Sequence, residues 1–112
     1  MKQFFLQLLK IVFLLSLITQ KVQISYAIEN GEALFKNNCS VCHLGGNNII
    51  IPEKNLKGKT LEANGMNSVS AISYQILNGK NGMPAFGGRL KENEIREIAK
   101  YVLTESASNF EN

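Results

Sequence analysis

Apolar residues recur with a helical period near the end of the chain. In the segment after residue 91 they are spaced three and four positions apart: Ile95, Ile98, Ala99, Val102 and Leu103. This spacing places them on one stripe of a helix, and we expect that stripe to be buried. Glu92, Glu94 and Glu97 lie early in the same segment, where the helix dipole favours negative charge. No alternating apolar and polar run is long enough to predict a sheet.

A first helix is expected over residues 29–42, because this stretch contains apolar positions and no proline. The run Gly45-Gly46-Asn47-Asn48 ends it. Residues 49–58 are then predicted to form a loop, which starts with an extended Ile49-Ile50-Ile51 segment. The chain returns to helical patterning only after this loop.

Two short helices are predicted between this loop and the last helix. One covers residues 61–64, with Thr60 as its N-cap. The other starts at Ser68 or Ser70 and ends at Asn78-Gly79. Its predicted buried face consists of Val69, Ile72, Ile76 and Leu77. The chain is therefore predicted to be an all-helical domain with glycine-rich loops.

The first 27 residues have a different pattern. They contain three lysines, no acidic residue, an apolar run over residues 11–18 and the ending Ser25-Tyr26-Ala27. A basic start, a short apolar middle and small residues at the −3 and −1 positions are typical of an export signal, here cleaved after Ala27. The apolar run is shorter than the about 20 residues that a membrane anchor needs. We expect a cleaved signal peptide over residues 1–27 and a soluble, monomeric domain over residues 28–112.

Composition limits the function classes that this domain can serve. The chain has 12 Lys and Arg against 9 Asp and Glu, and the excess lies in the signal segment, so no nucleic-acid partner is indicated. A length of 112 residues supports one domain and excludes multidomain enzymes and doubly wound nucleotide-binding folds. So small a core usually needs a metal, disulfides or a cofactor, and two cysteines cannot form a disulfide framework.

The chemistry is concentrated in Cys39-Ser40-Val41-Cys42-His43. This C-x-x-C-H spacing lets two thiols form thioether bonds to one haem and places the histidine to ligate its iron. A thioredoxin-type motif would need strands, structural zinc four ligands, and blue copper two histidines, whereas His43 is the only histidine. A simple Cys39–Cys42 disulfide would leave His43 unexplained. We therefore predict a covalently bound haem.

The second iron ligand must be Met66 or Met83, because no histidine remains and Met1 leaves with the signal peptide. Met83 is favoured, since it lies in a loop stiffened by Pro84, whereas Met66 is expected to fill apolar space. The other ring nitrogen of His43 should donate to a carbonyl supplied by residues 45–52. With two strong ligands the iron can only pass electrons, so we expect an electron carrier and not an enzyme.

The mature sequence resembles the cytochrome c6 family, the soluble haem proteins of the photosynthetic lumen in algae and cyanobacteria. The matching motifs are Asn30-Gly31-Glu32 with Phe35, residues 39–43 and 45–48, Leu61-Glu62-Ala63-Asn64, Tyr74-Gln75, residues 78–81, residues 83–90, and Tyr101-Val102-Leu103. The resemblance implies a class I cytochrome c fold, with about four short helices around one haem c. Gly65 and Gly82 depart from it, and we expect Gly82 to loosen the methionine loop slightly.

The resemblance also implies residue roles. It assigns Cys39 and Cys42 to the haem thioethers and His43 and Met83 to the iron. It implies that Gln75 lies near the haem and raises its potential. It implies that Arg89 lies beside the exposed haem edge and helps to dock photosystem I. Finally, it implies that the first helix crosses the last where Gly31 and Phe35 meet Tyr101.

In function, the resemblance implies electron transfer from the cytochrome b6f complex to photosystem I, in the thylakoid lumen of an algal chloroplast or the cyanobacterial equivalent. The short signal and the Asn-, Ile- and Lys-rich composition favour a plastid-encoded algal origin. Three alternatives remain open. They are a bacterial-type cytochrome c that donates to a terminal oxidase, a haem peroxidase with a loose sixth ligand, and a thiol–disulfide protein.

Overall fold

A computed structural model of the chain describes residues 1–23 and 30–111. Its helices are α1 (Lys2–Asn38), α2 (Ser40–His43), α3 (Gly58–Ala63), α4 (Val69–Asn78) and α5 (Glu92–Ala107), with short 3-10 turns at Leu44–Gly46 and Pro52–Lys54. In the described part of the chain, β pairing is limited to isolated bridges, Lys80 with Met83 and Gly87 with Leu90. The predicted all-helical class is confirmed.

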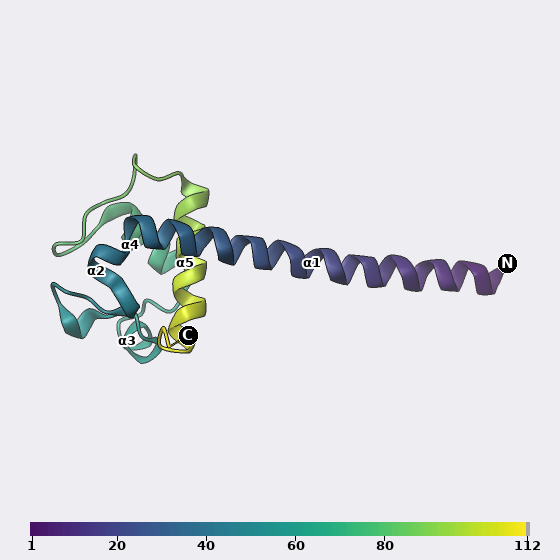
Figure 1. Cartoon of the computed structure of the whole chain (residues 1–112), viewed down its shortest axis with the longest axis horizontal. Coiled ribbons are helices and arrows are strands. Elements are labelled where there is room, and N and C mark those ends of the chain that lie inside the picture. Colours follow the sequence, from purple (N-terminus) through teal and green to yellow (C-terminus); the bar gives the residue numbers. More distant parts are fainter. Residues whose placement is uncertain (112) are drawn as a thin grey trace.

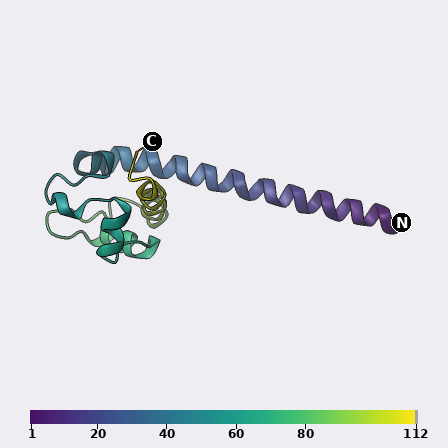
Figure 2. The same ribbon diagram turned by 90° about the horizontal axis from the view of Figure 1, so that it is seen from below.

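The N-terminal part of α1 projects away from the rest of the molecule, in the view of Figure 1 and in the perpendicular view of Figure 2. Residues Lys2–Gln23 are long and apolar enough to cross a membrane, with a mean hydropathy of 1.6, and none of this stretch is buried. Signal sequences share these properties. The predicted cleavage after Ala27 lies outside the described residues and stays a prediction.

The core forms where α1 crosses α5. A side chain at Gly31 would overlap the carbonyl oxygen of Glu97 and lie 2.9 Å from Cβ of Tyr101, so only glycine allows the two helices to approach this closely. The rings of Phe35 and Tyr101 pack against each other beside this contact, tilted by 53° and with centroids 5.3 Å apart. The crossing implied by the resemblance is therefore confirmed.

The last helix buries the predicted stripe. Ile95, Ile98, Ala99 and Val102 are buried and Leu103 is half-buried. The other buried apolar residues are Phe35, Leu61, Ile72, Ile76, Phe86 and Tyr101. Glu94 closes the N-terminus of α5, where its carboxylate accepts a hydrogen bond of 3.0 Å from the backbone N–H of Lys91.

Two upstream predictions need correction. The first helix does not run unbroken through residue 42: α1 ends at Asn38, Cys39 departs from helical φ at −118°, and α2 follows. Residues 49–51 bend and are not extended, because the side-chain oxygen of Asn48 accepts hydrogen bonds of 3.0 and 2.9 Å from the N–H groups of Ile50 and Ile51.

The short helices differ in how well the sequence locates them. Helix α3 begins at Gly58, so Thr60 lies inside it and does not cap it, and the first intrahelical bond runs from Leu61 to the carbonyl of Lys57. Ser68 caps α4 as predicted, since its hydroxyl accepts a 3.1 Å hydrogen bond from the N–H of Ala71. The prediction that Leu77 is buried is wrong: it remains 45% exposed, although its side chain lies against the Gly87 backbone.

Candidate haem site

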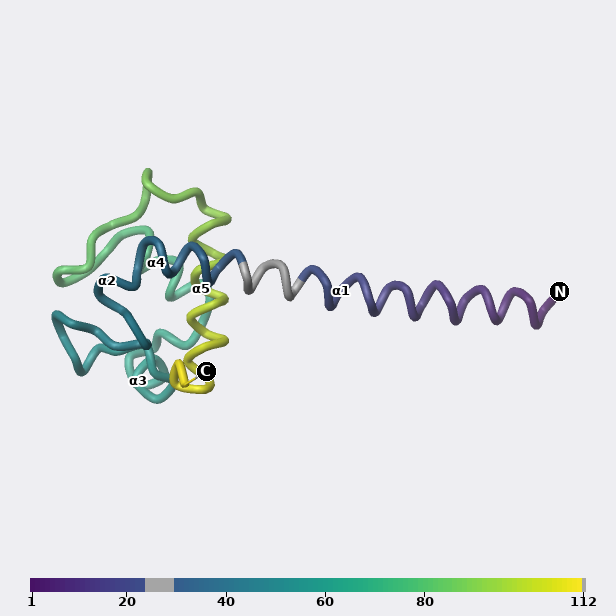
Figure 3. Tube along the Cα trace, in the orientation of Figure 1, coloured from purple at the N-terminus to yellow at the C-terminus, as the bar shows by residue number. Residues whose placement is uncertain are grey.

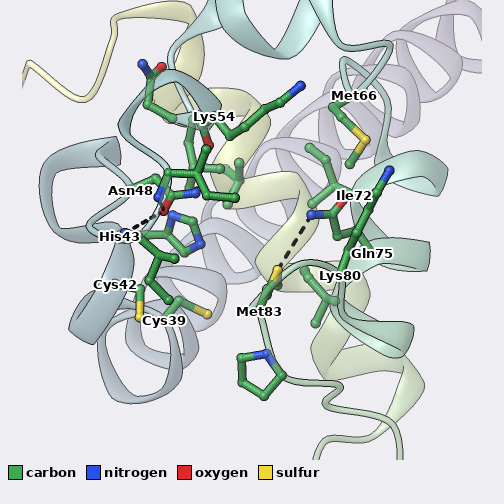
Figure 4. A pocket seen from close by; sticks show the side chains of 18 of the residues that line it. Cys39, Cys42, His43, Asn48, Lys54, Met66, Ile72, Gln75, Lys80 and Met83 are labelled. Atoms are coloured by element: carbon green, nitrogen blue, oxygen red, sulfur yellow. Dashed lines mark hydrogen bonds between the residues drawn. The ribbon is translucent and has the colours of Figure 1, made fainter.

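A cavity of about 410 Å³ opens between the two halves of the domain (Figure 4). One wall is built from the end of α1, from α2 and from the loop after it, and the other from α4 and the loop that carries Met83. Its floor contains buried apolar residues of three helices, among them Leu61, Ile76 and Ile98. The cavity is thus apolar at depth and polar only where particular side chains enter it.

Cys39 and Cys42 are free, half-buried thiols on one wall. They lie within one helical turn, in which the N–H groups of Cys42 and His43 both donate to the carbonyl of Cys39, at 3.1 and 2.9 Å. Burial, reinforced by the negative charge that Cys42 would carry, raises the pKa of the Cys39 thiol to about 11. The turn therefore presents both sulfur atoms to the same cavity, with Cys39 held as a thiol at neutral pH.

The ring of His43, the last residue of α2, also lines the cavity. Its Nδ1 atom lies 2.8 Å from the carbonyl oxygen of Asn47, which fixes the ring orientation and leaves Nε2 as the nitrogen available to a metal. The prediction that residues 45–52 supply this carbonyl is confirmed. The positive φ values of Gly45 and Gly46, +63° and +75°, turn the chain back so that Asn47 reaches the ring.

Met83 lies across the cavity from His43 (Figure 4). Lys80 and Met83 exchange two backbone hydrogen bonds of 3.0 Å around Asn81 and Gly82, whose φ values are +46° and +89°. Positive φ at both central residues, with the Asn-Gly sequence, is the tight hairpin turn that only such residues accept readily. Glycine accepts the φ of Gly82 without strain, so it suits this turn. The expectation that Gly82 loosens the loop stays a prediction.

Gln75 of α4 reaches the sulfur of Met83. Its Nε2 atom donates a long hydrogen bond of 3.8 Å to Met83 Sδ, drawn as a dashed line in Figure 4. Met66 also lines the cavity and packs against the core, but no hydrogen bond involves its sulfur among the described contacts. Of the two methionines, Met83 is the one whose sulfur is oriented by a neighbouring side chain.

Arg89 lies at the edge of the cavity on an exposed loop. Its guanidinium carbon is 4.9 Å from the centroid of the buried Phe86 ring, and its backbone N–H donates to the carbonyl of Phe86 at 3.0 Å. A cation over an aromatic face is held there by the ring quadrupole. The charge is thus fixed beside the cavity instead of moving freely in solvent.

Three polar residues of the lining were given no role at the site from the sequence. Asn48, Lys54 and Asn64 form a chain in which the Lys54 ammonium donates to the Asn64 side chain and the Asn48 amide donates to the Lys54 carbonyl at 3.1 Å. Lys54 and Asn64 are ten positions apart on different elements, so no sequence spacing pairs them. From the sequence, the Asn-rich loop around Asn48 was predicted only to be a turn.

The site suits a haem attached through thioether bonds. It presents two thiols on one turn and a histidine with one ring nitrogen hydrogen-bonded and the other free. The apolar cavity is closed by the loop that carries a methionine. These features define a c-type cytochrome.

Comparisons with known proteins agree. Residues 27–102 match the family described as "Cytochrome C oxidase, cbb3-type, subunit III", so this part of the chain belongs to that family of cytochrome domains. The chain is 61% identical over 84 residues to cytochrome c6 of Bumilleriopsis filiformis, covering 75% of this chain and 98% of that protein. It is 49% identical over 94 residues to cytochrome c6 of Gracilaria tenuistipitata var. liui, covering 82% and 87%. The solved structure of cytochrome c6 from the diatom Phaeodactylum tricornutum superposes with a TM-score of 0.71 at 43% identity, covering 73% of this chain and 97% of that one.

The chain belongs to the cytochrome c6 family. It is therefore an electron-transfer protein, not an enzyme, and carries one covalently bound haem c. The class I cytochrome c fold predicted from the resemblance is confirmed by the superposition.

Proposed function

We propose that this protein is the soluble carrier that passes single electrons from the cytochrome b6f complex to photosystem I in a thylakoid lumen. The observation that carries the proposal is the pair of opposed side chains, His43 and Met83, on either side of the cavity that Cys39 and Cys42 line. Identity above 50% to cytochrome c6 of several algae supports the photosynthetic setting.

In this proposal Cys39 and Cys42 hold haem c through thioethers, and His43 Nε2 and Met83 Sδ ligate its iron. The group supplies the exchange of one electron between ferric and ferrous iron. The chain supplies the rest: Asn47 orients His43, Gln75 orients Met83, and the apolar floor of the cavity excludes water. Two strong ligands leave no open coordination position, which argues against a peroxidase.

The proposed docking surface is the mouth of the cavity. Val41 and Ile50, which line it, are 84% and 56% exposed, and Arg89 places a fixed positive charge at its edge. An apolar surface with a charge beside it suits brief contact, in which electrostatics guides the encounter and little buried area delays release.

We further propose that residues 1–27 are a cleaved signal peptide. The exposed apolar segment Lys2–Gln23 and the start of the family match at residue 27 support this. Mass spectrometry of the protein from its native membranes should give a chain that starts at Ile28. An intact N-terminus would instead make the segment a membrane anchor.

The second candidate is a bacterial-type cytochrome c that donates to a terminal oxidase. It is favoured by the description of the matching family and by a TM-score of 0.63, at 37% identity, to the structure titled "OmcF, Outer membrance cytochrome F from Geobacter sulfurreducens". Both candidates use the same site, so only the partner separates them.

The deciding experiment is flash-induced oxidation of the purified, pre-reduced protein by photosystem I particles. Rapid loss of the reduced haem bands is the expected result. Bands that stay reduced after the flash, but disappear with a terminal oxidase, would favour the second candidate. A preparation without haem bands would contradict the assignment of Cys39, Cys42 and His43.

A further inference from the structure

The last residues of the chain fold back over the loop that follows His43. After α5 the chain reverses through Asn109 and Phe110, both at positive φ (+55° and +61°), and the N–H of Phe110 bonds the carbonyl of Glu105 at 2.9 Å. Figure 3 shows the C-terminal end lying beside α3, and the N–H of Gly58 donates to the Asn109 side chain at 3.4 Å. A left-handed conformation is unfavourable for phenylalanine, so contacts of its ring must offset that cost.

Those contacts are with Gly46 and two aromatic residues. A Cβ at Gly46 would lie 2.8 and 2.9 Å from Cγ and Cε2 of Phe110, so the ring lies directly against the glycine backbone. The ring centroid is also 6.0 Å from that of Phe35 and 6.4 Å from that of Tyr101. Gly46 is buried, and its carbonyl accepts a 2.7 Å hydrogen bond from Leu56.

Gly46 immediately precedes Asn47, whose carbonyl is bonded to Nδ1 of His43. Asn47 itself is exposed, and its backbone N–H donates to the carbonyl of Leu44 at 3.2 Å. The backbone of Gly46 therefore sets the direction of the Asn47 carbonyl. The Phe110 ring covers this backbone on one side. Phe110 is not among the residues that line the haem cavity.

We propose that Phe110 is a positioning residue for the iron ligand His43, acting through Gly46 on the Asn47 carbonyl. This inference rests on the proposed ligation by His43. Because a ring nitrogen that donates a stronger hydrogen bond makes the imidazole a better electron donor, a loosened Asn47 carbonyl favours ferrous iron and raises the midpoint potential.

The test compares full-length haem proteins. In Phe110→Ala, hydrogen exchange of the His43 Nδ1–H, followed by NMR in the reduced state, should be about tenfold faster, and the midpoint potential should rise. Phe110→Leu should restore part of both. Leu103→Ala is the matched control: it removes a half-buried apolar side chain of α5, the helix that precedes Phe110, and Leu103 lines neither the haem cavity nor the pocket beside Phe110. It should change neither quantity.

Equal exchange in Phe110→Ala and Leu103→Ala would overturn the proposal. If Phe110→Ala does not retain its haem, Gly46→Ala serves instead, because its new Cβ pushes the loop against an intact ring. Exchange that stays at the wild-type rate there would also overturn it. The wild-type NMR spectrum separates this from the proposed function: His43 signals that show no iron ligation would contradict the ligation itself.

Discussion

The hydrogen bond from Gln75 to Met83 offers a direct test of how the protein tunes its iron. If Met83 ligates the iron as proposed, an amide N–H that points at its sulfur withdraws electron density from that sulfur. The sulfur then donates less to ferric iron, and the ferrous state is favoured. Gln75→Met removes the donor and keeps the length of the side chain, so we expect the midpoint potential to fall.

The expected size of the decrease in midpoint potential follows from the length of the Gln75–Met83 hydrogen bond. At 3.8 Å the contact is long even for a sulfur acceptor. We therefore assign it about 1 kcal/mol, which for one electron converts to about 40 mV if the bond is lost on oxidation. This is an upper limit, because a bond that survives in the ferric state contributes only the difference between the two states.

The assay is a spectroelectrochemical titration of the reduced haem bands in the wild type and in Gln75→Met. Tyr74→Phe is the control, because Tyr74 is the neighbouring residue on α4 and is 72% exposed. Its potential should equal that of the wild type. A potential in Gln75→Met that is unchanged or higher, while NMR still shows Met83 on the iron, would refute the reasoning.

Three further predictions concern the proposed ligand Met83, the helix crossing and the proposed docking edge. Met83→Ala should bind cyanide, which the wild type should not, and an absorption titration in which both bind equally would remove Met83 from the iron. Gly31→Ala should lower the free energy of guanidinium unfolding by about 2 kcal/mol, as overpacking of about 3 kcal/mol exceeds a helix-propensity gain of about 1 kcal/mol. Ala33→Gly, at an exposed site of the same helix, should cost only about 1 kcal/mol, and a stabilised Gly31→Ala would contradict the crossing. Arg89→Glu should slow flash oxidation by photosystem I about tenfold at low salt with an unchanged haem spectrum, and equal rates would exclude a docking role.

The parts of the fold that follow from local pattern were predictable. The stripe on α5 is set by a spacing that any amphipathic helix shares, and the Ser68 cap depends on residues three positions apart. The break at Cys39 was not predictable in this way, since no glycine or proline marks it. The start of α3 at Gly58 was missed for a related reason, because the backbone of Lys57 begins that helix without a side-chain cap.

In the site too, local features could be predicted from the sequence and long-range contacts could not. The C-x-x-C-H turn is local, and its residues were identified from the sequence alone. The Asn81-Gly82 hairpin is also local, but the sequence led only to the expectation that Gly82 loosens the loop. The Asn47 carbonyl could be predicted only as one of eight positions, because its aim depends on the φ values of Gly45 and Gly46. The Lys54–Asn64 pair and the Phe110–Gly46 contact join residues that only tertiary packing brings together, so no pattern in the chain indicates them.

The crossing of α1 and α5 has a consequence for the order of events in biosynthesis. The ring of Phe35 packs against Tyr101 of the last helix and against Phe110 beyond it, so a growing chain that still lacks these residues cannot close this part of the core. Until the final residues emerge, Cys39 and Cys42 stay accessible on an open chain. The two helices that pack together thus lie at opposite ends of the domain sequence. This leaves an interval between synthesis of the C-x-x-C-H turn and closure of the fold. During that interval the haem-attachment machinery can reach both thiols.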